Sequence, residues 1–361
     1  MKNLKSFYSS LIKRVYVERG AEEYKAVTTA KDALKDIDFR VVATTGEIPA
    51  EHLNGTTLFL RRHPGNPVTR CPGSRGHLCC NYHTIDLYAG CGLGCSYCIM
   101  RSYLNFSPVT VYVDPEPAIE AVRELAQAKG GETLRIGTGE VGDSLLYDPI
   151  FRLSEPFIRG LADCDTVHFE MKTKTDFVDH LLDIDAKGNA VIGFSLNPPE
   201  ISSREEGIAS SIEARLSAAR RAVHAGYRVS FHFDPVFKSE RWQELYFPLI
   251  DRLSDIPAQN IAWISMGVFR YTPELKQRIA SRPYLYDEYV RSADGKFRYL
   301  QKIRVEIYKE LLNRLREATG AKVYMCMESA AVWKRVYGAL PDEIESLSSI
   351  FDDDPARSKI L

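Results

Sequence analysis

The sequence predicts an α/β protein in which parallel strands are joined by helical crossovers. Beyond residue 80, short β-rich runs alternate with longer helical patterns, and polar or sulfur-bearing residues follow several of these runs. Recurrent strand–helix units imply parallel strands with helices between them. The alternation fits a full or partial β/α barrel or a doubly wound sheet, and in barrels the chemistry lies at the carboxyl ends of the strands.

The expected strands are short runs rich in β-branched, aromatic and other apolar residues. Several end in an unusual group, such as GTGE at 137–140, HFD at 232–234 and CMES at 326–329. The runs span residues 83–88, 133–139, 166–174, 190–197, 227–235, 260–269 and 321–327.

The expected helices have apolar residues at helical spacing, and some end at a glycine, which stops a helix. They span residues 115–131, 149–162, 176–182, 212–226, 241–253, 302–320 and 329–338. Residues 1–20 are expected to form a plain amphipathic helix and not a signal peptide, since a sustained apolar stretch and a cleavage site are missing.

Length and composition indicate a folded protein that is large enough for one large domain or two ordinary ones. The chain has 361 residues, 45% of them hydrophobic, and a net charge of −1. No global basic field therefore points to nucleic acid, and no apolar run is long enough to span a membrane. We expect a cytoplasmic protein with an N-terminal extension at 1–80, the barrel at 81–340 and a C-terminal tail at 341–361.

Eight cysteines are present, and six of them fall within residues 71–98. Crowding of this kind in a large, apparently cytosolic chain suits metal or redox chemistry better than disulfides. The stretch CGLGCSYC places Cys91, Cys95 and Cys98 on one loop directly after a strand. A structural zinc site would need a second cysteine or histidine pair at a suitable spacing, whereas three thiolates suit a four-iron cluster with one iron left open.

The spacing Cys91-x3-Cys95-x2-Cys98, with Tyr97 before the last cysteine, resembles the signature of radical S-adenosylmethionine (SAM) enzymes. The resemblance implies a [4Fe-4S] cluster whose open iron binds SAM. It also implies an electron donor such as flavodoxin or ferredoxin, and cleavage of SAM to a 5′-deoxyadenosyl radical that abstracts hydrogen.

A more specific resemblance covers most of residues 57–338. Stretches such as RIGTGEVGDSLLYD, HAGYRVSFHFDPV and MCMESAAVWKRVYG look like the spore photoproduct lyase family. The resemblance implies a partial (β/α)6 TIM-like barrel of the radical SAM type, and repair of a pyrimidine photolesion in DNA. Alternatives are a radical reaction on a small molecule, a peptide or another nucleic acid, and a non-catalytic metal-containing module that binds nucleic acid.

The same resemblance implies which residues bind SAM. Gly137, Thr138, Gly139 and Glu140 would meet the methionyl end of SAM, while Lys174 and Ser195 stand at later strand ends. A carboxylate suits the SAM ammonium and a lysine suits its carboxylate. Lys174 also fits an ordinary surface lysine at a strand end.

This sequence departs from the lyases at two positions. Glu140 stands where the lyases have their hydrogen-donating cysteine, and Ile99 replaces a tyrosine that follows their last cluster cysteine. Cys326, at the end of the last expected strand, is the best-placed substitute thiol, although a buried apolar cysteine is the alternative. Tyr97 and Cys326 are the candidate catalytic residues.

Three other cysteines precede the first strand of the expected barrel and have no assigned role. We expect them either to approach the site or to ligate a second cluster: Cys71, Cys79 and Cys80.

Local basic stretches predict a place for DNA. Residues 289–299, YVRSADGKFRY, read as a hairpin that carries Arg291, Lys296 and Arg298 between aromatic residues. Cations for phosphates and aromatics for bases are what an unstacked nucleotide needs. The alternative is a solvated hairpin with a half-buried aromatic face.

Overall fold

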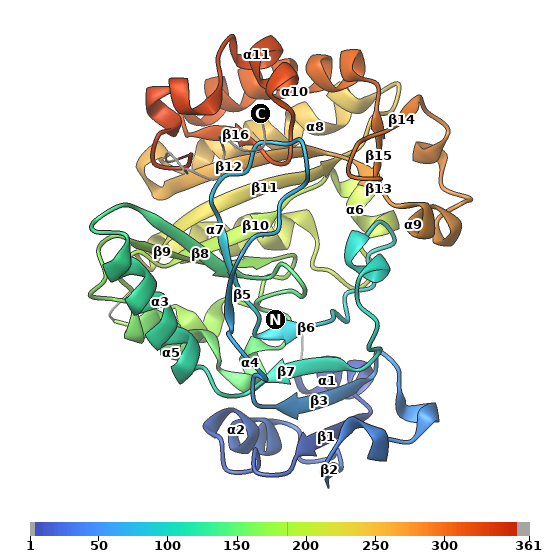
Figure 1. Ribbon diagram of the computed structural model, residues 1–361, viewed down its shortest axis with the longest axis vertical. Coiled ribbons are helices and arrows are strands. Elements are labelled where there is room, and N and C mark those ends of the chain that lie inside the picture. The colour runs from blue at the N-terminus through green and yellow to red at the C-terminus, as the bar shows by residue number, and fades with distance from the viewer. Residues whose placement is uncertain (1–3, 186, 352–361) are drawn as a thin grey trace. The chain divides into compact units, whose positions relative to one another are not determined.

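The computed structural model describes residues 4–185 and 187–351 (Figure 1). Within these residues the chain forms two compact units. The first contains residues 4–69, 83–94, 103–185 and 187–190, and the second contains residues 70–82, 95–102 and 191–351. Each unit therefore contains segments from both of the predicted domain ranges, 1–80 and 81–340. Most of the expected C-terminal tail, from residue 352 on, lies outside the described residues.

A mostly parallel sheet, which the sequence did not predict, opens the first unit. Its strand order is β2-β1-β3-β7-β6, where β6 runs antiparallel to β7. The strands are β1 (Arg14–Glu18), β2 (Phe39–Val42), β3 (Thr57–Arg61), β6 (Tyr88–Ala89) and β7 (Val109–Tyr112). The helix predicted over residues 1–20 is wrong beyond its first half, because α1 (Leu4–Leu11) ends and the buried strand β1 follows.

Three parallel strands of the first unit match the predicted barrel strands. They are β5 (His83–Ile85), β8 (Leu134–Thr138) and β9 (Val167–Thr173). Figure 1 shows α3 and α5 beside β8 and β9, and α5 contacts both α3 and β9. The other elements of this unit are α2 (Lys25–Ala33), α3 (Glu116–Ala128), α4 (Asp148–Phe151) and α5 (Ser154–Gly160), and β4 (Val68–Arg70) spans the boundary between the units.

Three predicted elements are shorter than expected, each for a local reason. The helix over 149–162 is interrupted at Arg152, whose φ of 55° is left-handed. The helix over 176–182 is only a 3-10 turn, Asp179–Leu181, because the Phe177 amide donates its hydrogen bond to the Thr175 hydroxyl. The strand over 83–88 divides, since its last residue joins β6 in the N-terminal sheet.

Four parallel strands form the main sheet of the second unit, in the order β10-β11-β12-β16. Their bounds are β10 (Val191–Ser195), β11 (Arg228–Val236), β12 (Ile261–Val268) and β16 (Val323–Met325). The strands are almost wholly buried, as the apolar runs predict for a sheet covered on both faces. The helices of this unit are α6 (Pro199–Glu205), α7 (Ile212–His224), α8 (Trp242–Asp251), α9 (Pro273–Arg278), α10 (Gln301–Thr319) and α11 (Ala330–Tyr337).

The predicted hairpin is confirmed as part of a small antiparallel sheet. Strands β14 (Tyr289–Arg291) and β15 (Phe297–Tyr299) pair with each other, and β15 also pairs with β13 (Arg270–Tyr271). Gly295 takes φ 81° in the turn, as expected for an Asp-Gly pair. Among the described residues, no helix is both long and apolar enough to cross a bilayer.

Candidate functional site

The three cysteines of the loop form no disulfide and lie in three different environments. Cys91 is exposed, Cys95 is buried and Cys98 is intermediate. Gly92, between the first two, allows a close approach: an added Cβ would lie 2.5 Å from the Tyr147 hydroxyl and 2.9 Å from Leu11. The backbone of this loop is therefore seated where no larger side chain fits.

The donor set of the loop fits an iron–sulfur cluster better than a closed zinc site. Cys91, Cys95 and Cys98 offer three soft thiolates, and soft ligands select zinc or iron–sulfur centres. Within residues 4–185 and 187–351, no three histidine, cysteine or carboxylate side chains are already gathered in a geometry that holds a metal ion. Three thiols on one loop, with a fourth ligand missing from the motif, match a cluster that keeps one iron open.

The peptide between the last two cysteines is fixed by the end of α6. The Ser96 amide donates to the Glu205 carbonyl at 2.8 Å, and the Ser96 hydroxyl donates to the Glu205 carboxylate. The Tyr97 hydroxyl donates to the Glu206 carboxylate. Burial and the neighbouring Glu206 charge raise the pKa of Tyr97 well above its ordinary range, so the phenol stays protonated and donates.

Arg215 of α7 connects Glu206 to the end of β10. Its guanidinium donates to the Glu206 carboxylate at 2.5 Å, and to the main-chain carbonyl of Ser195 at 2.8 Å. Both charged side chains are almost fully buried, at 0% and 1% exposure. A buried ion pair of this kind is tolerated when hydrogen bonds satisfy both partners. The second unit thus places Tyr97 and Ser195 on one polar network.

The glycine turn after β8 is shaped by its contact with β9. An added Cβ on Gly139, which has φ 97°, would lie 2.7 Å from the Ser144 hydroxyl and 2.8 Å from the Lys172 carbonyl. The Thr138 hydroxyl donates to Ser144 at 2.7 Å, and the Ser144 amide donates to Lys172 at 3.0 Å. Only glycine fits at this position, so the turn has a structural reason for its sequence.

Glu140 follows this turn and is half-buried. Burial raises the pKa of its carboxyl group, while the nearby Lys172 ammonium lowers it and Asp86 raises it further. The net shift is upward, which means that the charged form of Glu140 is held at a cost. A ligand cation placed against this carboxylate would relieve that cost.

Asp143 joins the glycine turn to Lys174 at the end of β9. One oxygen of this buried carboxylate accepts the amides of Leu145 and Leu146, at 3.0 and 2.9 Å, and the Thr173 hydroxyl at 2.7 Å. The other oxygen accepts the Lys174 amide at 2.7 Å. The first unit thus brings two predicted SAM-binding segments together, through a residue that the sequence did not single out.

Cys326 follows β16 and is half-buried. Its amide donates to the Met266 carbonyl at 2.7 Å. The segment 71–80, which carries the three unassigned cysteines, lies beside the residues that follow Cys326: Leu78 pairs with Glu328, and the Ser74 hydroxyl contacts the Met327 sulfur at 3.5 Å. The unassigned cysteines of this segment are therefore near the chain that carries Cys326.

Two of those cysteines interact directly. A hydrogen bond between Cys71 and Cys79 raises the pKa of the Cys79 thiol above its ordinary value, and burial adds to the shift. The shift favours the protonated form of Cys79, unlike a metal-bound thiolate. Their role in a second cluster, or as hydrogen donors, stays a prediction.

The three predicted DNA-contacting cations of the hairpin differ in exposure. Arg291 is exposed, whereas Arg298 is 1% exposed and forms two hydrogen bonds of 2.7 Å to Asp294. Lys296 donates to Ser74 at 3.0 Å, and burial lowers its pKa. Arg298 therefore has a structural partner and is too buried to contact a phosphate. Of these three cations, only Arg291 has an exposed side chain.

The aromatic residues of the hairpin stack on one another. Tyr289 stacks on Tyr299 with ring centroids 4.6 Å apart, and Phe297 stacks on Tyr271 at 5.3 Å. This stacking is the half-buried aromatic face that the sequence left as the alternative. Tyr286, which precedes β14, is the aromatic that projects into solvent, at 79% exposure.

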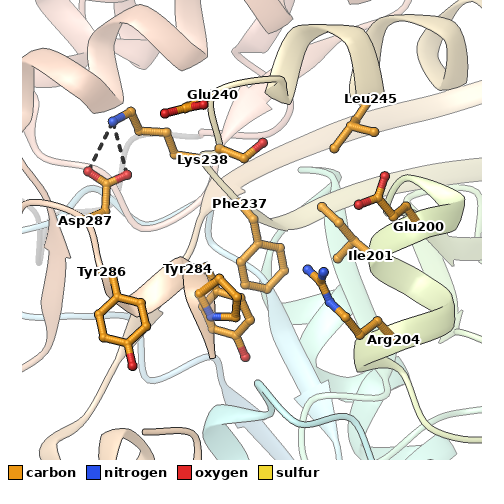
Figure 2. Close-up of a pocket in the computed structure, with 12 residues that line it drawn as sticks. Glu200, Ile201, Arg204, Phe237, Lys238, Glu240, Leu245, Tyr284, Tyr286 and Asp287 are labelled. Atoms are coloured by element: carbon orange, nitrogen blue, oxygen red, sulfur yellow. Dashed lines mark hydrogen bonds and ion pairs between the residues drawn. The ribbon is translucent and has the colours of Figure 1, made fainter. Parts of the chain in front are cut away.

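A pocket of about 430 Å³ lies in the second unit. Figure 2 shows Phe237 and Tyr284 together in this pocket, with the Arg204 guanidinium pointing toward them from α6. The Phe237 ring also packs edge-on against Tyr97, at 5.3 Å. Phe237 thus lines the pocket and also contacts Tyr97 of the cysteine loop. None of the predicted site residues lines the pocket itself.

Comparison with known families gives a direct assignment. A family model described as spore photoproduct lyase matches residues 11–287, which is more than half of the 361 residues. The chain belongs to the spore photoproduct lyase family.

Curated members of the family align over parts of the chain. The spore photoproduct lyase of Geobacillus sp. (strain Y412MC61) is 28% identical over 173 residues, which cover 48% of this chain and 51% of that protein. The spore photoproduct lyase of Bacillus subtilis (strain 168) is 24% identical over 254 residues, covering 68% of this chain and 74% of that protein. The chain spans about half the length of the Geobacillus relative.

Solved structures of the family confirm the fold. A spore photoproduct lyase mutant with dinucleoside spore photoproduct superposes with a TM-score of 0.75 and 22% identity, over 87% of this chain and 98% of that chain. Another mutant, with bound AdoMet and dinucleoside spore photoproduct, gives a TM-score of 0.73 at 23% identity over the same shares. The predicted α/β partial barrel of the radical SAM type is confirmed.

Proposed function

We propose that this chain is a radical SAM enzyme that holds a [4Fe-4S] cluster on Cys91, Cys95 and Cys98. The observation that carries the proposal is the three-cysteine loop, which lies inside the region matched by the spore photoproduct lyase family model. When bound, the cluster would supply the electron that cleaves SAM to a 5′-deoxyadenosyl radical. The missing fourth cysteine leaves one iron for SAM.

The polar strand ends would bind and orient SAM. The Glu140 carboxylate would pair with the SAM ammonium, and the backbone at Gly137, Thr138 and Gly139 would approach the methionyl group without a side chain in the way. Lys174 would pair with the SAM carboxylate, and Ser195 would complete the contact. The network through Asp143 holds the first of these segments, and the network through Arg215 holds Ser195.

We propose a pyrimidine photolesion in DNA as the substrate. The spore photoproduct lyases to which the chain is similar support this choice, and so do two exposed residues of the hairpin region, Arg291 in β14 and Tyr286 before it. A cytoplasmic location and an electron donor, such as flavodoxin or ferredoxin, complete the proposal. Both remain predictions.

The presence of Glu140 favours a second candidate function, in which the same radical chemistry acts on a substrate other than a DNA photolesion. The resemblance implies that the lyases have a hydrogen-donating cysteine where this chain has Glu140, and a carboxylate cannot donate a hydrogen atom as a thiol does. Repair would therefore need another thiol, and Cys326 is the proposed donor. Without one, the radical would serve a small molecule, a peptide or another nucleic acid.

The decisive experiment is anaerobic reconstitution with iron and sulfide, followed by dithionite and SAM. We expect about four irons per chain and release of 5′-deoxyadenosine. An intact cluster without 5′-deoxyadenosine would refute the enzyme, and bound zinc would favour a non-catalytic module. An oligonucleotide with the photoproduct then tests the substrate: 5′-deoxyadenosine without restored thymines would exclude repair and leave the second candidate.

A further inference from the structure

Two adjacent acids at the C-terminal end of α6, the last helical residue Glu205 and the capping residue Glu206, contact two adjacent residues of the cysteine loop. Glu205 receives hydrogen bonds from the Ser96 side chain and Glu206 receives one from Tyr97, while the Ser96 amide donates to the Glu205 carbonyl at 2.8 Å. Ser96 and Tyr97 are the only residues between Cys95 and Cys98 in the sequence. The short peptide that sets the spacing of the two thiols is therefore fixed from outside the loop.

Glu206 lies in an environment that favours one orientation of its carboxylate. Besides Tyr97, it accepts hydrogen bonds from Asn197 at 3.0 Å, from Ser202 at 2.7 Å and from Arg215. A buried charge is costly when its partners are missing, and a network whose members are satisfied becomes rigid. Tyr97 donates into this network and is thereby held in place.

Arg215 extends the network in two directions. Its guanidinium donates to the carbonyl of Ser210 at 2.9 Å and to the carbonyl of Ser195 at 2.8 Å. Ser195 is the last residue of β10 and a proposed SAM contact. One buried ion pair thus connects the peptide between two cysteines to the strand end where SAM would bind.

We propose that Glu206 is a positioning residue that acts through Tyr97 on the Cys95–Cys98 peptide and through Arg215 on Ser195. The proposal rests on the proposed function, because it gives Tyr97 a place in cofactor binding. It also replaces the catalytic role expected for Tyr97: the hydroxyl is engaged by Glu206 and the side chain is 6% exposed. The loop and the strand end are expected to shift together when Glu206 is lost.

The first test uses the apo protein, so it does not depend on a cluster. Tyr97→Phe removes one donor and leaves the Glu206–Arg215 pair intact. Alkylation of the buried Cys95 requires the loop to open, and loss of one net hydrogen bond should speed it about three- to tenfold. Buried Cys80, in the same unit, and Cys164, in the first unit, serve as internal controls whose rates should not change.

The second test compares Glu206→Gln with Glu200→Gln, which changes an exposed acid in the first turn of α6, the helix that Glu206 caps. Glu206→Gln should speed alkylation of Cys95, hasten iron loss to a chelator after reconstitution, and weaken SAM binding by roughly tenfold. Glu200→Gln should match the wild type in all three measurements. If Glu206→Gln does not fold, Tyr97→Phe still decides the first effect.

The outcomes separate the inference from the proposed function. Equal Cys95 alkylation in wild type and Tyr97→Phe would overturn the positioning role, and so would equal acceleration of Cys95 and Cys80, which would indicate general loosening. Normal iron retention with loss of product formation alone would restore Tyr97 as a catalytic residue. A wild-type chain that binds no cluster would refute the proposed function, while the alkylation rates would still decide whether Glu206 fixes the loop.

Discussion

Glu140 is a carboxylate whose charge is partly desolvated, and the positive charge of Lys172 partly compensates for this. We expect Glu140→Gln to weaken SAM binding about ten- to a hundredfold, because a charge-assisted contact is worth on the order of 1.5–3 kcal/mol. Isothermal titration of the reconstituted enzyme measures the change, and cluster content should not fall. Glu140→Cys is the sharper variant: it should also impair SAM cleavage, and undiminished 5′-deoxyadenosine formation in both variants would refute the assignment.

The raised pKa of Glu140 predicts the pH dependence of SAM binding. The ordinary pKa of the group is 4.5, and the pKa in the folded chain lies above it because burial penalises the charged form. As the pH falls through the raised pKa, the carboxylate becomes protonated and SAM affinity should decrease. Glu140→Gln should remove this dependence. It should not lower the free energy of unfolding at neutral pH, because the charged form is the disfavoured one in the folded chain.

Asp143 predicts a stability effect at the glycine turn. Asp143→Asn would place a donating NH2 group against the amide of Lys174, or against the donors on the other carboxylate oxygen. Loss of a charged hydrogen bond, together with an unpaired buried donor, should cost about 2–4 kcal/mol. Urea unfolding of the apo protein measures it, with Asp163→Asn as the control, for which a much smaller change is expected because the ion pair of Asp163 with Arg123 is exposed to solvent. A change as small as the control's would contradict a role for Asp143 as the link between the two segments.

At the scale of elements, the hairpin β14–β15 carries buried or half-buried cations with structural partners and one exposed cation, Arg291, that is available to DNA. We expect Arg291→Ala to weaken DNA binding and to reduce the magnitude of its salt dependence by about one phosphate contact. We expect Arg298→Ala to destabilise the hairpin instead, because Asp294 would lose the hydrogen bonds that keep its pKa low despite burial. Fluorescence anisotropy at several salt concentrations measures the first effect, with the exposed Lys334→Ala of α11 as the matched control. Equal salt slopes for all three variants would remove the hairpin from the proposed DNA surface.

At the scale of the whole molecule, each unit has an apolar core built from its own strands and helices. Buried residues fill β8 and β9 in the first unit, and β10, β11 and β12 in the second. Iron removal by a chelator should therefore leave the far-ultraviolet circular dichroism unchanged and abolish only SAM cleavage. A structural zinc module would instead unfold when its metal is removed. Loss of secondary structure on chelation would favour that rival.

The strand–helix alternation beyond residue 80 was readable because each element carries its own local signal. The runs 166–174 and 260–269 are rich in β-branched and aromatic residues, as strands are, and glycines end the expected helices over 115–131, 212–226 and 302–320. The N-terminal sheet was missed because its strands are only two to five residues long. In addition, β3 pairs with β7, which is distant in the sequence. Local patterns do not report pairing of this kind.

By itself, the sequence determined the α/β class, the three-cysteine loop and the strand ends that carry polar groups, because spacing and periodicity are properties of the chain alone. Only the tertiary structure decided which charges are buried. In the sequence, Asp143, Glu206 and Arg215 look like any other charged residues. Arg291 and Arg298 look alike, yet Arg291 is exposed and Arg298 is fixed by Asp294. The reason is physical: the cost of burying a charge, and the partners that offset it, depend on neighbours that folding brings from distant parts of the chain.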